Sequence, residues 1–143
     1  HALEYPLSPH ESARLSGVDV SLKDFKLPSE ENLIIEGAGG LMVPLNESGD
    51  LVIDIAREIE AEIIVVIKNY LGSINHSLLT IDYLKRNNFK IKGLVINGQV
   101  TPSSERVIEK VSGCKILFRI PFTEGISSGF VNEQALIARK ALT

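Results

Sequence analysis

The sequence predicts an α/β protein in which a parallel sheet carries helices on both faces. Four apolar runs have the length and the β-branched content typical of buried parallel strands. Segments with helical periodicity lie between them, and the connections are short. Alternation of strands and helices with short connections is typical of a parallel sheet. The four runs are Asn32–Glu36, Glu62–Ile67, Ile91–Asn97 and Lys115–Ile120.

Helical patterns alternate with these runs. The predicted helices are Leu51–Glu60, Ser73–Arg86, Pro102–Val111 and about Asn132–Leu142. Thr101 precedes Pro102 as an expected N-cap, and Gly113 follows that helix as an expected end. In Ser73–Arg86, the expected apolar face comprises Ile74, Leu78, Ile81 and either Leu84 or Leu79.

A further short helix is expected near the beginning of the sequence. Ser8 would be its N-cap, Pro9 its first residue and Glu11 the reciprocal member of a capping box. Gly17 would end it after Ser16. The segment from Asp24 to Asn32 is a polar connector interrupted by a proline.

The composition is that of an ordinary globular domain. The 143 residues are 44% hydrophobic and 23% charged, which allows one domain with a real core. The net charge of −3, without a basic stripe, argues against nucleic-acid binding. One cysteine excludes a disulfide framework and suits a reducing cytoplasm. No apolar run approaches the roughly 20 residues of a membrane-spanning helix, and no signal-peptide pattern opens the chain.

The first residues are His-Ala-Leu-Glu-Tyr rather than a methionine. We therefore expect that a segment upstream has been cleaved or lies outside this sequence.

The most informative segment follows the first apolar run. Glu36 opens a loop, Glu-Gly-Ala-Gly-Gly, at the predicted carboxyl end of a strand. Open α/β sheets bind ligands at this edge, glycines allow close approach of the backbone, and phosphate-bound Mg²⁺ needs carboxylate oxygens. Glu36 is thus a candidate metal ligand. An ordinary turn with a solvated acid is the alternative, and these residues alone leave it open.

A second candidate site follows the next strand. Gly72 permits an unusual backbone angle, and Ser73 could cap the helix that begins there. Free amides at a helix start bind anions, and Asn75 and His76 add polar side chains on the first turn. Capping without a ligand is the simpler alternative.

Two further segments end the third and fourth strands. Asn97 is followed by glycine, which is usual in a turn, but its amide could also read a nucleobase. Pro121 and Phe122 precede Thr123 and could form the wall of a slot for a ring-shaped ligand, or simply a proline-set turn. All these candidates lie at carboxyl ends of strands, hence at one edge of the sheet.

Other polar residues are not expected to act. His1 and His10 lack metal-ligand neighbours at useful spacing, and Cys114 is expected to be a small buried residue. The expected solvated face of the third main helix comprises Glu105, Arg106, Glu109 and Lys110.

Several segments, taken in order, resemble the dethiobiotin synthetase family, the ATP- and Mg²⁺-dependent ligases of biotin biosynthesis. The matching pieces are Ser-Pro-His at 8–10, Ile-Glu-Gly-Ala-Gly-Gly at 35–40, Val-Pro-Leu at 43–45, Leu-Gly-Ser-Ile-Asn-His at 71–76, Leu-Leu-Thr at 78–80, Asn97 and Ile-Pro at 120–121. Glu-Gly-Ala-Gly-Gly is shared with amidotransferase-type synthetases, whereas the Leu-Gly-x-Ile-Asn-His segment is more specific. The similarity spans nearly the whole chain.

The resemblance implies a P-loop NTPase-like fold of which residues 1–143 are the C-terminal two-thirds of one domain. Family members join CO₂ to 7,8-diaminopelargonic acid through a carbamate that ATP phosphorylates before ring closure. Carried over, Glu36 would bind Mg²⁺, and the segment 36–39 would lie against the nucleotide phosphates. The implied nucleotide-binding residues are Glu36, Gly37, Ala38, Gly39, Asn97, Pro121, Phe122 and Thr123. The implied substrate carboxylate site is Gly72, Ser73, Ile74 and Asn75, across the interface of a homodimer.

The sequence departs from the family pattern in one respect. It contains no Gly-Lys-Thr or Gly-Lys-Ser phosphate loop, so the catalytic lysines of the family have no counterpart here and the catalytic residues are unknown. The strand feeding that loop would lie centrally in the family's sheet, so unpaired inner edges are expected. Three interpretations follow: the C-terminal part of a dethiobiotin synthetase, a related P-loop synthetase with another acid substrate, or a non-catalytic dimerisation module.

Overall fold

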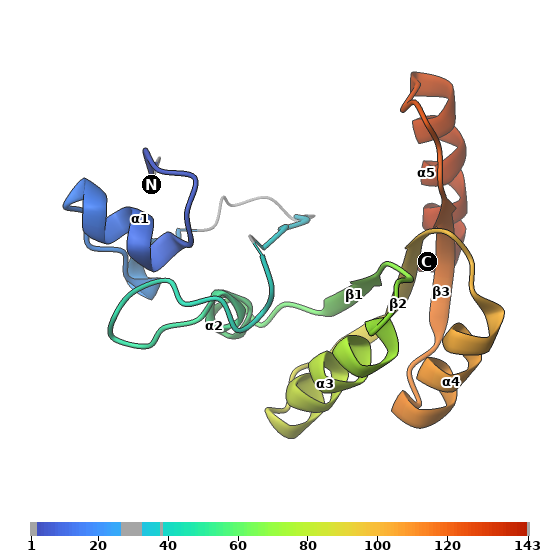
Figure 1. Ribbon diagram of the computed structural model, residues 1–143, viewed down its shortest axis with the longest axis horizontal. Helices are drawn as coiled ribbons and strands as arrows, with labels where there is room; N and C mark the ends of the chain where they lie inside the picture. The colour runs from blue at the N-terminus through green and yellow to red at the C-terminus, as the bar shows by residue number, and fades with distance from the viewer. Residues whose placement is uncertain (1–2, 27–32, 38, 143) are drawn as a thin grey trace. The chain divides into compact units, whose positions relative to one another are not determined.

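The computed structural model describes residues 3–26, 33–37 and 39–142. The chain forms two compact units, His1–Ala61 and Glu62–Thr143, which are considered separately. The first unit contains α1 (Pro9–Ser16), the 3-10 helix η1 (Leu22–Asp24) and α2 (Val52–Glu58) (Figure 1). The second contains β1 (Ile63–Ile67), α3 (Ser73–Arg86), β2 (Ile91–Gly98), α4 (Pro102–Ser112), β3 (Ile116–Pro121) and α5 (Ser128–Leu142).

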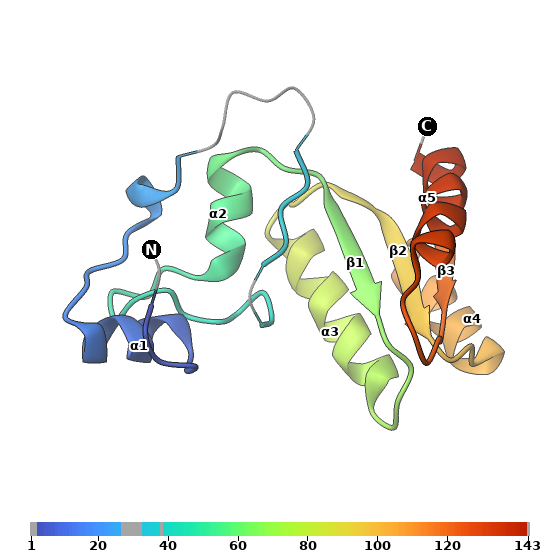
Figure 2. The same ribbon diagram turned by 90° about the horizontal axis from the view of Figure 1, so that it is seen from above.

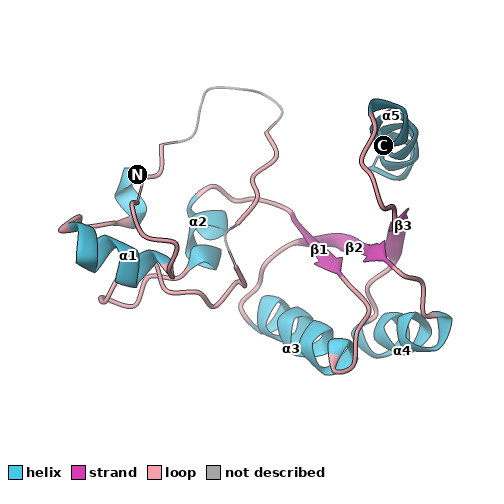
Figure 3. Cartoon of the chain, turned by 45° about the horizontal axis from the view of Figure 1, so that its top comes forward, coloured by secondary structure: helices cyan, strands magenta, loops and turns pink. Residues whose placement is uncertain are grey.

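The second unit is the predicted α/β arrangement. Its strands are parallel and lie in the order β1-β2-β3. Helices α3 and α4 cover one face of the sheet, and α5 lies on the other face, against β3 (Figure 3). Three of the four predicted strands are therefore confirmed, together with a sheet that carries helices on both faces.

The core of this unit lies between the sheet and the helices α3 and α4. The central strand β2 contributes Leu94 and Ile96, both fully buried. The edge strand β1 alternates instead, since Val65 and Ile67 are buried, whereas Val66 is 62% exposed. Figure 2 shows α3 running beside β1, and the two elements are in contact. The expectation that this run would be buried on both faces was wrong, because only one face of β1 is covered.

Helix α3 has the predicted bounds but a rotated buried face. Ile81 and Leu84 are buried as expected, but Ser73 and Ser77 complete the buried row, and Leu79 is 61% exposed. Buried positions at four- and three-residue spacing form one stripe along a helix. The small serines on this stripe allow α3 to pack closely, and apolar pattern alone could not reveal them.

Glycine correctly predicted the ends of two helices, but side-chain capping was wrong. Gly17 ends α1 and Gly113 ends α4, both in the left-handed region with φ of 63° and 65°. The side chains of Ser8 and Thr101 make no cap hydrogen bond. In α1, the expected capping-box residue Glu11 instead accepts hydrogen bonds from Arg14.

The last helix is longer than predicted. It begins at Ser128, and the Ser127 hydroxyl accepts a hydrogen bond from the Phe130 N–H at 3.2 Å. This capping serine is a local signal that the apolar pattern of the helix obscured. In the part of the chain that the structure describes, no helix is long and apolar enough to cross a membrane.

The first unit is irregular, and the predicted strand Asn32–Glu36 is not formed. Asn32 lies outside the described residues, and residues 33–37 have no regular secondary structure. Ile34 is 96% exposed. A strand is stable only when a neighbour satisfies its backbone groups, and no described strand pairs with this segment. A small core is instead built from Ala13, Val20, Leu45 and Ile53.

Candidate functional site

The carboxyl edge of the sheet, formed by the strand ends at Ile67, Gly98 and Pro121 and the loops that follow, gathers most of the predicted site residues of the second unit. Asn97 pairs in register with Ile120, and Gly98 with Pro121. The residues predicted for a purine slot therefore lie on adjacent strand ends. Both Asn97 and Phe122 are exposed, the latter by 68%.

The loop after β3 continues this surface. The Thr123 hydroxyl donates to the Gly125 carbonyl at 2.8 Å and accepts from the Gly125 N–H at 3.3 Å. These bonds fold the loop into a tight turn. The turn holds the exposed ring of Phe122 next to the strand end at Pro121.

The predicted anion site lies at the start of α3. Gly72 is the N-cap residue with φ of 102°, so the expected cap Ser73 is instead the first helical residue and is buried. Its N–H donates to the Tyr70 carbonyl at 3.0 Å. Among the described residues, the N–H groups of Ile74 and Asn75 have no backbone acceptor outside the helix. Two donors thus remain at a helix start, where the dipole also favours an anion.

The loop leading to this helix is held by polar contacts. The Tyr70 hydroxyl and His76 Nδ1 are 2.7 Å apart, which ties the loop to the first turn of α3. Leu71 between them is fully exposed. The loop therefore relies on hydrogen bonds rather than on buried apolar side chains for its shape.

A buried carboxylate that sequence analysis misassigned connects three loops or strands at this edge. Glu105, expected on a solvated face, is only 2% exposed. Its Oε1 accepts from the Thr101 N–H at 2.9 Å and from Asn69 Nδ2 at 3.1 Å. Its Oε2 accepts from Arg119 Nε at 2.9 Å. The Glu105 side chain therefore caps α4 and connects the β1–α3 loop, the β2–α4 loop and β3 at the edge where ligands are expected.

The surroundings of Glu105 keep it ionised. Burial alone would raise the pKa of the carboxyl group. The hydrogen bonds from the Thr101 N–H and from Arg119, with the positive charge of Arg119, outweigh burial and hold the pKa below its ordinary value of 4.5. Glu105 is thus a fixed negative charge at neutral pH.

A second acid of α4 was also misassigned. Glu109 is half-buried, and its Oε1 accepts from the Ile116 N–H at 2.7 Å, at the beginning of β3. This contact lies at the opposite end of the strand from Pro121. Both errors have one origin, because each carboxylate accepts a hydrogen bond from a residue outside its own helix.

The Glu36 loop belongs to the first unit. Glu36 is exposed, and among the described residues no hydrogen-bond partner contacts it. Ala38 lies outside the described residues. Gly37 and Gly39 lie close to valine side chains of the same unit. A Cβ added at Gly37 would lie 3.0 Å from Val52 Cγ1, and one added at Gly39 would lie 2.9 Å from Val43 Cγ2. A side chain at either position would therefore crowd a neighbouring valine, so both glycines favour the internal packing of this unit.

Glu36 could supply one oxygen ligand to Mg²⁺, but alone it does not form a complete metal site. Mg²⁺ is commonly held by one or two carboxylates together with phosphate oxygens and waters. An exposed carboxylate without an internal partner meets that requirement. In the described ranges, however, no group of three histidine, cysteine or acidic side chains gathers to form a complete metal site.

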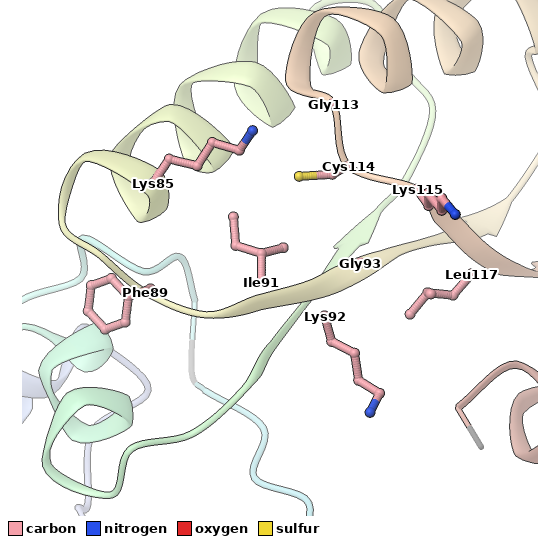
Figure 4. A pocket seen from close by; sticks show the side chains of 9 residues that line it. All are labelled: Lys85, Phe89, Ile91, Lys92, Gly93, Gly113, Cys114, Lys115 and Leu117. Carbon is pink, nitrogen blue, oxygen red and sulfur yellow. The ribbon is translucent and has the colours of Figure 1, made fainter.

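Each unit also contains a hollow. One, of about 400 Å³, lies at the amino ends of β2 and β3 and includes Lys85, Gly93 and Cys114 (Figure 4). There, Lys85 Nζ donates to the Ser112 carbonyl. The other, of about 410 Å³, lies in the first unit between α1 and the segment around Asn46. Neither includes a residue of the predicted nucleotide or substrate site.

Comparison with known proteins gives consistent relatives. The family described as AAA domain matches residues 1–128. The ATP-dependent dethiobiotin synthetase BioD of Cytophaga hutchinsonii is 45% identical over 138 residues, covering 95% of this chain and 66% of the relative. That of Christiangramia forsetii is 39% identical, covering 99% and 68%. That of Bacillus thuringiensis subsp. konkukian is 38% identical, covering 98% and 61%. The chain thus spans about two thirds of the length of these relatives.

Proposed function

The chain belongs to the AAA-domain family of ATP-dependent dethiobiotin synthetases, and we propose that the protein closes the cyclic urea of dethiobiotin. Its substrates would be 7,8-diaminopelargonic acid, CO₂ and ATP. The observation that carries this proposal is the 45% identity to a dethiobiotin synthetase over 95% of the chain. A cytoplasmic location and a homodimer are part of the same proposal.

The proposed nucleotide subsite combines Asn97 with Pro121, Phe122 and Thr123. The Asn97 amide offers both a donor and an acceptor to the edge of adenine. The exposed ring of Phe122 supplies an apolar wall for the base. Support comes from the pairing of the strand ends, which sets Gly98 opposite Pro121. In the first unit, Glu36, Gly37, Ala38 and Gly39 would lie along the phosphates.

The proposed diamino-acid subsite is the start of α3. A substrate carboxylate would accept hydrogen bonds from the N–H groups of Ile74 and Asn75, and the Asn75 side chain is exposed beside them. Gly72 and Ser73 complete the turn. Such a site fixes the end of the substrate remote from its amino groups, so binding there orients the reacting amines.

Magnesium would be held by Glu36 together with phosphate oxygens. When bound, the metal neutralises charge on the phosphates during phosphoryl transfer. The Glu36 carboxylate supplies one oxygen ligand.

The proposed reaction balances as follows. CO₂ adds to one amino group and gives a carbamate, and that nitrogen releases a proton. A carbamate oxygen then receives the γ-phosphoryl group of ATP, with ADP as the leaving group. The second amine attacks the carbamoyl carbon, expels phosphate, loses a proton and closes the ring. The chain's own residues bind and orient the two substrates along the carboxyl edge, and the lysines that would act on the phosphates have no counterpart in residues 1–143.

The test is an ATPase assay on the purified full-length protein with and without 7,8-diaminopelargonic acid, in bicarbonate buffer. We expect ADP release to depend on the diamino acid, with one dethiobiotin formed per ADP by mass spectrometry. Diamino-acid-independent turnover with another acid substrate would support a related P-loop synthetase instead. Absence of nucleotide binding by a folded protein would favour a non-catalytic dimerisation module.

A further inference from the structure

The loops at the carboxyl edge are connected by a small polar network centred on Glu105. This carboxylate accepts hydrogen bonds from Asn69 in the β1–α3 loop, from the Thr101 N–H in the β2–α4 loop and from Arg119 in β3. Asn69 Nδ2 also donates to the Gln99 carbonyl at 2.9 Å. Asn69 therefore links the β1–α3 loop both to helix α4, through Glu105, and to the β2–α4 loop, through Gln99.

We infer that Glu105 is a positioning residue that holds the diamino-acid loop (Asn69–Asn75) against the ends of β2 and β3. The inference rests on the proposed function, because that function assigns the loop its ligand, the substrate carboxylate. Glu105 itself would not contact either substrate. Its role would be to fix the start of α3 within its own protomer, so that the N–H groups there keep their place at the homodimer interface.

The physical basis is the weak packing of this loop. Leu71 is fully exposed and Tyr70 is 54% exposed, so little apolar burial restrains the backbone before Gly72. The strand ends are different, since Asn97 and Pro121 are held by the ladder between β2 and β3. Hydrogen bonds to an ionised, buried carboxylate are stronger than neutral ones. Glu105 therefore supplies a restraint that the β1–α3 loop does not gain from apolar packing.

The variant Glu105→Gln breaks the network without removing the side chain. An amide has one acceptor oxygen and one donor nitrogen, so its NH₂ must face either Arg119 or the donors of Thr101 and Asn69. The matched control is Glu109→Gln on the same helix. Glu109 also accepts a backbone hydrogen bond, from Ile116, but at the opposite end of β3.

The first measurement is steady-state kinetics with each substrate varied in turn. For Glu105→Gln we expect the KM for diaminopelargonic acid to rise about tenfold, which lies within the usual range of coupling between sites. The KM for ATP should change less than about twofold, since the ladder still holds the strand ends. Glu109→Gln should leave both constants at parent values. A uniform loss of kcat in both variants, with a lowered melting temperature, would overturn the inference and indicate a purely structural role.

The second measurement is amide hydrogen exchange, which does not depend on turnover. We expect exchange in the peptide that covers Asn69–Asn75 to be several-fold faster in Glu105→Gln than in Glu109→Gln or the parent. Unchanged exchange would overturn the inference even in an active enzyme. A parent protein that forms no dethiobiotin would refute the proposed function. Faster exchange in Glu105→Gln than in that parent would still support the positioning role of Glu105.

Discussion

Gly93 is the position where adding a single methyl group should be most damaging. It lies in β2 and pairs in register with Ile64. A Cβ at this position would lie 2.6 Å from Leu117 Cγ and 2.9 Å from the Lys115 carbonyl oxygen. That carbonyl accepts a hydrogen bond from the Leu94 N–H at 2.9 Å. Gly93→Ala must therefore shift β3 or disturb the ladder between β2 and β3.

The magnitude follows from two opposing effects. Overpacking of a well-packed site costs about 1–3 kcal/mol. Replacing glycine by alanine lowers the entropy of the unfolded chain, which stabilises the folded protein by about 0.4–1 kcal/mol. We therefore expect Gly93→Ala to lower the free energy of unfolding by about 1–2 kcal/mol. At a typical dependence on urea, the midpoint should fall by roughly 0.5–1 M.

The assay is urea unfolding of the parent, Gly93→Ala and a control, followed by far-UV circular dichroism. The control is Gly125→Ala, because a Cβ there would meet no atom within 4 Å. We expect its midpoint to match or slightly exceed that of the parent. Equal midpoints for Gly93→Ala and Gly125→Ala would show that β3 accommodates the methyl group. The close contact with Leu117 would then not destabilise the fold.

Three further predictions concern the site. Glu36→Gln should strongly reduce Mg²⁺-dependent turnover but leave the urea midpoint unchanged, because the side chain is exposed; unchanged turnover would remove Glu36 from the site. Gly72→Val should raise the KM for the diamino acid. The control Gly17→Val, at a similarly positive φ of 63°, should strain only α1. An effect confined to the KM for ATP would contradict the carboxylate role. The lowered pKa of Glu105 predicts a stabilising contribution that is full above pH 4.5 and is lost as the pH falls through the folded-state pKa. The difference in unfolding free energy between parent and Glu105→Gln should thus shrink below pH 4.5, and a constant difference would argue against this cause.

Local signals were sufficient for the helices α1 and α4. Proline at the first position and glycine after the last residue located α1 and α4 to within about a residue. Both signals act over one turn of backbone, so they are readable without knowing the rest of the fold. The strands β1, β2 and β3 were likewise predicted, because each is a short, mainly apolar and β-branched run between turn residues.

Features that depend on distant residues were not predictable. The run before Glu36 has a strand-like composition, but a strand requires a neighbour to pair with. Glu105 looked solvated because its sequence neighbours are charged, yet Asn69 and Arg119, 36 and 14 residues away, enclose it. Similarly, the row of buried serines on α3 follows from close packing rather than from hydropathy. In each case the deciding contact is long-range.

The packing of the glycine loop on Val43 and Val52 has an evolutionary consequence. A descendant that abandoned nucleotide chemistry would still be under some selection to keep Gly37 and Gly39, since an added Cβ there would crowd Val52 or Val43. The exposed Glu36 side chain makes no such packing contact with the described residues, so it would be substituted early. Among distant sequences, persistence of the acid, rather than of the glycines beside it, is therefore the better indicator of retained catalysis.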